Sequence, residues 1–111
     1  MNINIDFSKP ILSPESALAL QPTNLNEFYA GAGDFDKSNL FFVLLTSMHH
    51  YQDKGDTLRA GHLCFLLAYY LFVPLTPPGS ALLALHYIRK AIQYNDLPEY
   101  RQWLELIQKG N

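Results

Sequence analysis

Four histidines and a single cysteine are the side chains of this sequence best suited to bind a metal: His49, His50, His62, His86 and Cys64. Imidazole and thiolate are common protein ligands of zinc. On a helix, however, His62 and Cys64 stand two residues apart and point to nearly opposite sides, and neighbouring His49 and His50 diverge by about 100°. The spacing favours half-exposed or hydrogen-bonded histidines, so we predict neither a metal nor a cofactor.

Covalent catalysis would need an activated nucleophile. Cys64 lies within an apolar stretch, where burial raises the pKa of a thiol and makes it unreactive. Ser47 and His50 stand at helical spacing, but the sequence holds no Gly-x-Ser-x-Gly motif, and Gly31 and Gly33 lack the third glycine of a dinucleotide-binding turn. We therefore predict a protein that is not an enzyme. The enzymatic alternative is a small subunit whose histidines line a pocket between helices.

The composition indicates one ordered domain with few charges. The 111 residues are 49% hydrophobic and only 16% charged, and 8 Lys and Arg against 10 Asp and Glu give a net charge of -2. A nucleic-acid-binding domain usually carries a basic stripe, so we expect no nucleic-acid partner. One cysteine cannot form an intramolecular disulfide, and Met1–Phe7 has no basic region followed by an apolar run. Both features predict a protein of the reducing cytoplasm.

The most apolar run is Leu63–Leu75, which reads LCFLLAYYLFVPL. It is shorter than the roughly 20 residues that a membrane-spanning helix needs, it contains Pro74, and it follows Arg59 and His62. We therefore predict a buried core helix and no membrane contact, with a short tilted span as the alternative.

Residues 1–37 form an acidic, irregular arm in which we expect only short helices. The arm holds three of the seven prolines, and five acidic residues against two lysines. Serine, proline and glutamate at 13–15 supply a helix cap, a first-turn proline and an acid near the positive end of the helix dipole, which predicts a helix over 13–20. A second helix is predicted over 23–30, and Asn2–Phe7 is expected to be extended.

Helical periodicity then predicts four main helices within residues 38–111, over 38–54, 57–73, 80–95 and 99–108. Gly55 can take the left-handed conformation that ends a helix and Asp56 can cap the next one, so the first two helices must form an antiparallel hairpin. The second helix is apolar nearly all round and is expected in the middle of the fold. Pro74 is expected to end it, and Ser80 to cap the third helix.

The residues around the first turn stand as Y-x3-G-D-x3-A, which resembles the middle of a tetratricopeptide repeat: Tyr51, Gly55, Asp56 and Ala60. The third predicted helix matches the small, large, small spacing of the second helix of that repeat: Ala84, Ile88 and Ala91. The resemblance covers 39–107. The sequence departs from the family because Gly55 and Gly79 stand much closer together than the ~34-residue period of the repeat.

The resemblance implies a degenerate tetratricopeptide-like domain, in which antiparallel helical hairpins form a right-handed array that binds other proteins. The chain is similar in size and acidity to small bacterial adaptors and secretion chaperones of this type, which bind an apolar peptide or helix. This implied function is a non-catalytic protein–protein interaction.

Aromatic residues make up 14% of the chain, and several are adjacent, such as Phe41 with Phe42 and Tyr69 with Tyr70. One helix cannot bury adjacent side chains on a single face. Either the arm folds back to cover them, or a second protein does, which would be a partner or another copy in a structural homodimer. For the second case we predict five anchors: Tyr51, Tyr69, Tyr70, Tyr87 and Trp103.

Overall fold

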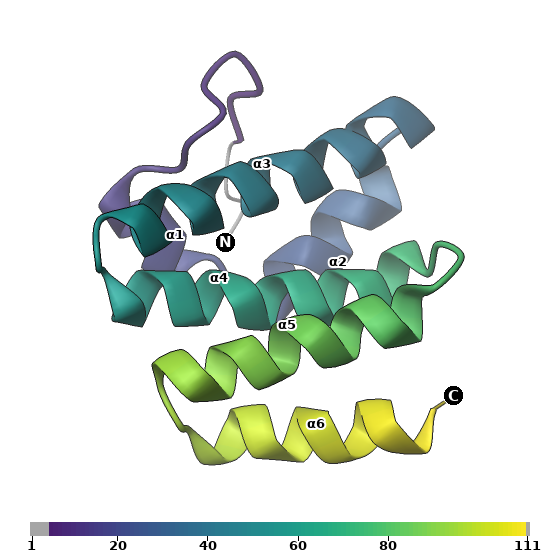
Figure 1. The fold of residues 1–111 in the computed structure, drawn as a ribbon. Helices are drawn as coiled ribbons and strands as arrows, with labels where there is room; N and C mark the ends of the chain where they lie inside the picture. Colours follow the sequence, from purple (N-terminus) through teal and green to yellow (C-terminus); the bar gives the residue numbers. More distant parts are fainter. Residues whose placement is uncertain (1–4, 111) are drawn as a thin grey trace.

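The computed structural model describes residues 5–110, and within this range the chain is built from helices, with no strand (Figure 1). The predicted all-α class is therefore confirmed. The elements in chain order are α1 (Pro14–Ala19), α2 (Pro22–Gly31), α3 (Asp34–Asp53), α4 (Thr57–Tyr70), its π-helical continuation η1 (Leu71–Leu75), α5 (Ser80–Tyr94) and α6 (Pro98–Lys109). Residues 2–4 of the predicted extended opening lie outside the described residues.

Capping explains why the arm contains two short helices. The Ser13 hydroxyl accepts a hydrogen bond from the Ser16 backbone N–H, and Pro14 occupies the first turn of α1. At the start of α2, the Gln21 backbone N–H donates to the Asn24 side chain at 2.8 Å. Both predicted short helices are confirmed, with ends that differ by one residue.

Helix α3 begins at Asp34, earlier than its predicted start at Ser38. The carboxylates of Asp34 and Asp36 lie in its first turn, where the positive end of the helix dipole stabilises them. At its other end Gly55 has a φ of 74°, which an L-residue rarely adopts, and this conformation turns the chain into α4 as predicted.

Helix α4 is the central helix of the fold. The Asp56 carboxylate caps it by accepting a hydrogen bond from the Arg59 backbone N–H at 3.2 Å. From Ala60 to Tyr70 every residue except His62 is buried. Since α4 contacts α3 and α5 most extensively and α1 and α2 in addition, its predicted position in the middle of the fold is confirmed.

Pro74 does not end this helix, contrary to the prediction. The chain continues through the proline as η1, because a widened turn relieves the clash between the proline ring and the carbonyl of the preceding turn. The helix ends at Thr76, which has a left-handed φ of 46° and donates its backbone N–H to the Leu71 carbonyl at 3.1 Å.

By length and composition, Thr57–Leu75 is the one helix in the described part of the chain that could cross a membrane. Within the bundle, however, 67% of its most apolar window is buried against the other elements. The predicted core helix is therefore confirmed. The absence of membrane contact stays a prediction.

Helices α3, α4, α5 and α6 lie side by side, and each reverses the direction of the one before it (Figure 1). Gly61 lets α4 and α5 approach closely, because a Cβ at this position would lie 3.1 Å from the Tyr94 Cβ. The start of α5 differs from the prediction. Gly79, with a φ of 77°, precedes the helix, so Ser80 is its first residue and not its cap.

Candidate functional site

The histidines and the cysteine are dispersed over the fold. Within residues 5–110, no three His, Cys, Asp or Glu side chains lie close enough together to hold a metal ion. His50 and His86 lie edge-on to the neighbouring rings of Tyr51 and Tyr87. The Nε2 atom of His62 lies 2.7 Å from the Leu20 carbonyl oxygen. The structure therefore does not bring these side chains together at one site.

Cys64 is fully buried at the centre of α4. Removal from water raises the pKa of its thiol to about 12, and the positive charge of Lys90 opposes the shift only in part. At neutral pH the thiol is protonated and has no access to solvent, so it is a core side chain and not a nucleophile.

Three of the five predicted anchors, Tyr51, Tyr69 and Tyr70, are core residues with exposures of 4%, 7% and 0%. Their hydroxyls are also occupied. Tyr51 donates to the Leu12 carbonyl at 2.6 Å, Tyr70 donates to the Lys37 carbonyl at 2.5 Å, and Tyr69 accepts from the Asn26 side chain at 2.6 Å. A buried side chain cannot contact a partner without opening the core. None of these three tyrosines is therefore available as an anchor.

The other two predicted anchors, Tyr87 and Trp103, are partly buried in different places. Tyr87 on α5 lies near Cys64, and burial raises the pKa of its hydroxyl. Trp103 on α6 packs edge-on against Tyr69, with ring centroids 5.2 Å apart. Cys64 and Tyr69 lie about 140° apart around α4. The five predicted anchors therefore do not form one surface.

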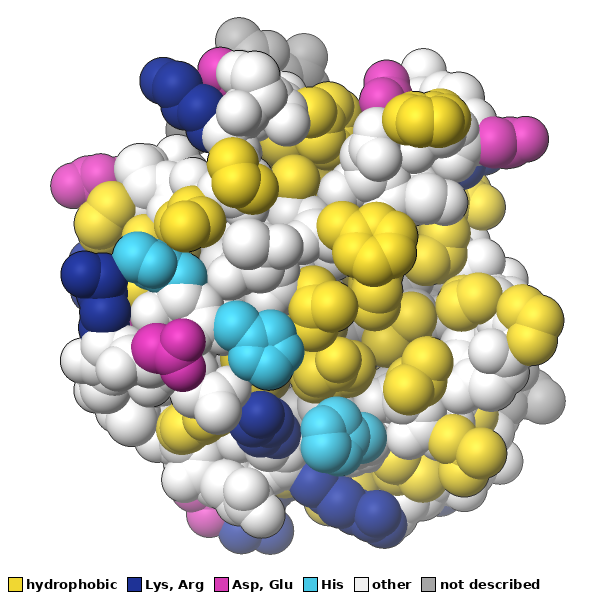
Figure 2. Space-filling model, turned by 45° about the horizontal axis from the view of Figure 1, so that its top comes forward, with side chains coloured by type: hydrophobic (Ala, Val, Ile, Leu, Met, Phe, Trp, Pro, Cys, Tyr) yellow, Lys and Arg dark blue, Asp and Glu magenta, His cyan; other side chains and the backbone are white. Residues whose placement is uncertain are grey.

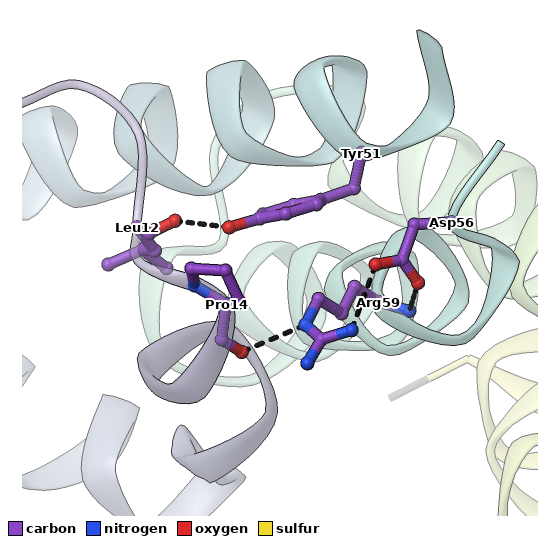
Figure 3. Close-up of polar contacts among 5 residues, drawn as sticks. All are labelled: Leu12, Pro14, Tyr51, Asp56 and Arg59. Carbon is purple, nitrogen blue, oxygen red and sulfur yellow. Dashed lines mark hydrogen bonds and ion pairs between the residues drawn. The ribbon is translucent and has the colours of Figure 1, made fainter. Parts of the chain in front are cut away.

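The N-terminal arm covers one side of the α3–α4 hairpin, and side chains of the hairpin hold its backbone (Figure 3). The Leu12 carbonyl accepts from Tyr51, and its backbone N–H donates to the Ser47 hydroxyl at 2.9 Å. Arg59 donates through Nε to the Pro14 carbonyl at 2.9 Å and through a terminal nitrogen to the Asp56 carboxylate at 2.9 Å. We call this covered side the arm interface.

Sequence reasoning missed the residues that hold the arm. Ser47 lies on the buried face of an amphipathic helix, and this was an available signal, because a buried hydroxyl needs a hydrogen-bond partner. His62 gave a second signal, because it is the exception in a helix that is apolar nearly all round after Ala60. Nothing in the sequence shows that both bind main-chain groups of the arm, since the partners are more than thirty residues away.

Elsewhere on the surface, α3 and α5 keep large apolar side chains in solvent. Phe35 and Phe42 on α3 are 81% and 58% exposed, and Leu82 and Leu83 on α5 are 76% and 43% exposed. We call this surface the α3–α5 face. Figure 2 shows a band of hydrophobic side chains over the middle and right of the side that it turns forward, and a further hydrophobic side chain apart from it at the upper right.

The two helices of the α3–α5 face lie on adjoining flanks of α4. Tyr94 of α5 is within electrostatic range of Asp53 at the end of α3, and Lys90 of α5 is within range of Cys64 below it. Phe41 and Leu45 on α3 are partly buried against the core. The apolar band is thus continuous with the core. Its outer side chains are only partly covered within the described part of the chain, and Phe42 lines a hollow beside Phe7 and Pro10 of the arm.

Charged side chains lie on opposite sides of the apolar band (Figure 2). Asp34 and Asp36 are exposed at the start of α3. His86, Arg89 and Lys90 line a hollow of about 410 Å³ on the outer side of α5. The α3–α5 face therefore has an acidic side, an apolar centre and a basic side.

In comparisons with known proteins, no family model matches the sequence, and no curated protein and no solved structure matches the chain.

Proposed function

We propose that this chain is a non-catalytic protein-binding module that uses the α3–α5 face as its docking surface. The observation that carries the proposal is the exposure of four large apolar side chains on two helices that flank α4: Phe35, Phe42, Leu82 and Leu83. Burial of apolar surface is the main driving force of protein association, and such side chains gain most from it.

The state of the reactive side chains supports a binding role over a catalytic one. The buried Cys64 thiol has a pKa of about 12, and His62 interacts through a ring nitrogen with a backbone carbonyl. General acid–base catalysis at neutral pH needs a group that titrates near pH 7 and can reach a substrate. Neither of these two groups meets both conditions.

The arrangement of the main helices supports the finer part of the proposal, a degenerate tetratricopeptide-like array. Helices α3 and α4 form one antiparallel pair around Gly55, and α4 and α5 form a second pair with a close approach at Gly61. On this proposal α4 serves both hairpins, which accounts for the short spacing between Gly55 and Gly79. The role would be that of a small bacterial adaptor or secretion-type chaperone in the cytoplasm.

The shape of the surface indicates the kind of protein segment it would take. Two helices with an apolar band between charged borders suit an amphipathic helix whose apolar residues recur every three or four positions. Such a helix would cover Phe42 and Leu82 with its apolar side and leave its polar side in water.

Site-specific photo-cross-linking tests the proposal. A photoreactive amino acid is placed at Leu82 on the α3–α5 face or, as a matched control, at exposed Glu27 on α2, and each protein is irradiated in its source cells. We expect protein adducts from position 82 that map to one apolar helix, and none from position 27. The same adducts from both positions, or no adduct from position 82, would refute the docking role of this face.

A further inference from the structure

The charges that border the α3–α5 face are not neutralised within the described chain. Three ion pairs form among residues 5–110, and none of them includes Asp36, Arg89 or Lys90. Asp34 has only a loose contact with Lys37, at 3.9 Å, and the Lys37 ammonium lies over the ring of Tyr29, 4.3 Å from its centroid. The acidic and basic sides of the face are therefore both free to attract a surface of opposite charge.

The order of these charges makes the face complementary to itself. In a twofold dimer, each patch of one copy meets the patch that lies across the symmetry axis on the other copy. Figure 2 shows acidic side chains at the upper right of the apolar band, and Lys, Arg and His side chains along its lower edge. A twofold axis through the middle of the band would place the acidic side of each copy against the basic side of the other.

We propose that the occupant of the α3–α5 face in the isolated protein is the same face of a second copy, related by a twofold axis. The inference rests on the proposed docking role of this face and names the partner. Phe42, Leu82 and Leu83 would cover the same residues of the second copy. Asp34 and Asp36 of each copy would meet Arg89 and Lys90 of the other. Each dimer would therefore contain two equivalent sets of ion pairs across its interface.

Charge complementarity favours a second copy over an unrelated helix. A partner of one sign could neutralise only one border of the face, and the other border would meet like charge or none. The second copy neutralises both borders at once, because it carries the same two borders in the reverse order. Phe35, which stands exposed between Asp34 and Asp36, would be covered by the same contact.

Charge reversal tests the pairing directly. One variant, D34K/D36K, makes both borders basic, and the other, R89E/K90E, makes both borders acidic. The mass in solution is measured by sedimentation over a range of concentrations for each variant alone and for their mixture. We expect the natural protein to dimerise and each variant alone to associate at least about tenfold more weakly, because like charges then face each other. The mixture should form a one-to-one heterodimer, since both sets of opposite charges are restored.

A matched control separates this effect from net charge. The variant E27K/E105K carries the same change in charge as D34K/D36K but places it on α2 and α6, where both side chains are exposed. It should dimerise like the natural protein, and the helical circular dichroism of every variant should be unchanged. Natural protein that stays monomeric at all concentrations would overturn the inference, as would a mixture of variants that does not associate.

The two experiments together distinguish failure of the dimer from failure of the docking role of the face. A monomeric natural protein that still gives a cross-link from position 82 to a helix of another protein refutes the second copy and keeps the docking role. Dimers that form in the sedimentation experiment, and whose cross-links from position 82 join two copies of this chain, support both.

Discussion

The arm interface and the α3–α5 face are both apolar surfaces of the same helical core, yet only one is covered. At the arm interface, Leu12, Ala17, Leu20 and Leu25 are at most 9% exposed, and side chains of the hairpin bind the arm backbone. At the α3–α5 face, Phe42 and Leu82 are 58% and 76% exposed. The chain thus uses its own N-terminal third to bury one side and leaves large apolar side chains of the other side in solvent.

The difference between the two surfaces lies in their polar groups. The arm is held by hydrogen bonds to main-chain atoms, and these depend on backbone geometry at fixed distances. The α3–α5 face offers apolar side chains with charged borders, which is the composition of a surface for association between folded chains. The first surface is part of folding, and we expect the second to be part of binding. Three mutational comparisons test this contrast.

The largest contrast is expected for leucine truncation. Leu20→Ala removes a side chain that is 1% exposed at the arm interface and should lower the free energy of unfolding by about 2 to 5 kcal/mol. Leu82→Ala on the α3–α5 face is the matched control and should change it by no more than about 0.5 kcal/mol in dilute protein. Urea unfolding measures both. Equal losses would show that the α3–α5 face also belongs to the core.

A smaller contrast is expected for the removal of one hydroxyl. Tyr51→Phe leaves the buried Leu12 carbonyl without its donor and should cost about 1 to 3 kcal/mol of unfolding free energy. Tyr87→Phe on α5 should cost less than about 0.5 kcal/mol. Thermal unfolding of the two variants and the natural protein measures both losses of stability. A Tyr51→Phe variant as stable as the natural protein would mean that its hydrogen bond does not hold the arm.

The smallest effect concerns pH. Burial lowers the pKa of His62, and the hydrogen bond to the Leu20 carbonyl and the charge of Glu99 oppose the shift. Near and below pH 6.5, the ordinary pKa of histidine, the unfolded chain therefore binds more protons than the native chain. The stability that neutral His62 contributes is fully present above pH 6.5. It is lost as the pH falls from there through the lowered pKa of His62 in the folded protein.

The variant His62→Gln keeps an N–H donor for the Leu20 carbonyl and removes the titration. We expect the urea midpoint of the natural protein to fall between pH 7.5 and pH 5.5, and that of the variant to fall by less. The two carboxyls with a lowered pKa, Asp6 and Asp96, titrate below this range, so they do not obscure the comparison. Parallel curves for the two proteins would contradict the account of His62.

Most of the helices could be predicted because their signals are local. Apolar spacing, a glycine at 55 and an aspartate at 56 define the α3–α4 turn within a few residues, and a serine before a proline defines the start of α1. The prediction failed at Pro74 and Ser80. There the backbone has alternatives, a widened turn and a left-handed glycine, that residue type alone does not specify.

The sites could be predicted less well, because burial depends on contacts far along the chain. Tyr51, Tyr69 and Tyr70 are of a residue type that often anchors interfaces. Residues 1–37, however, supply the hydrogen-bond partners of all three hydroxyls, and these partners lie more than thirty residues away. The sequence left two alternatives for these side chains, cover by the arm or cover by a second protein. The structure shows that the arm covers some aromatic residues and leaves others, such as Phe35, exposed, and this outcome depends on packing.

Thiol labelling tests the central claim, that the α3–α5 face is covered by a second molecule while the arm interface is already closed. Because Cys64 is buried, Leu82→Cys supplies the one accessible thiol of its variant, and Ala19→Cys on α1 supplies the control. The rate of maleimide labelling is measured in dilute and in concentrated protein. We predict that the rate at position 82 falls as concentration rises while the rate at position 19 stays constant. Equal and constant rates at both positions would contradict the account.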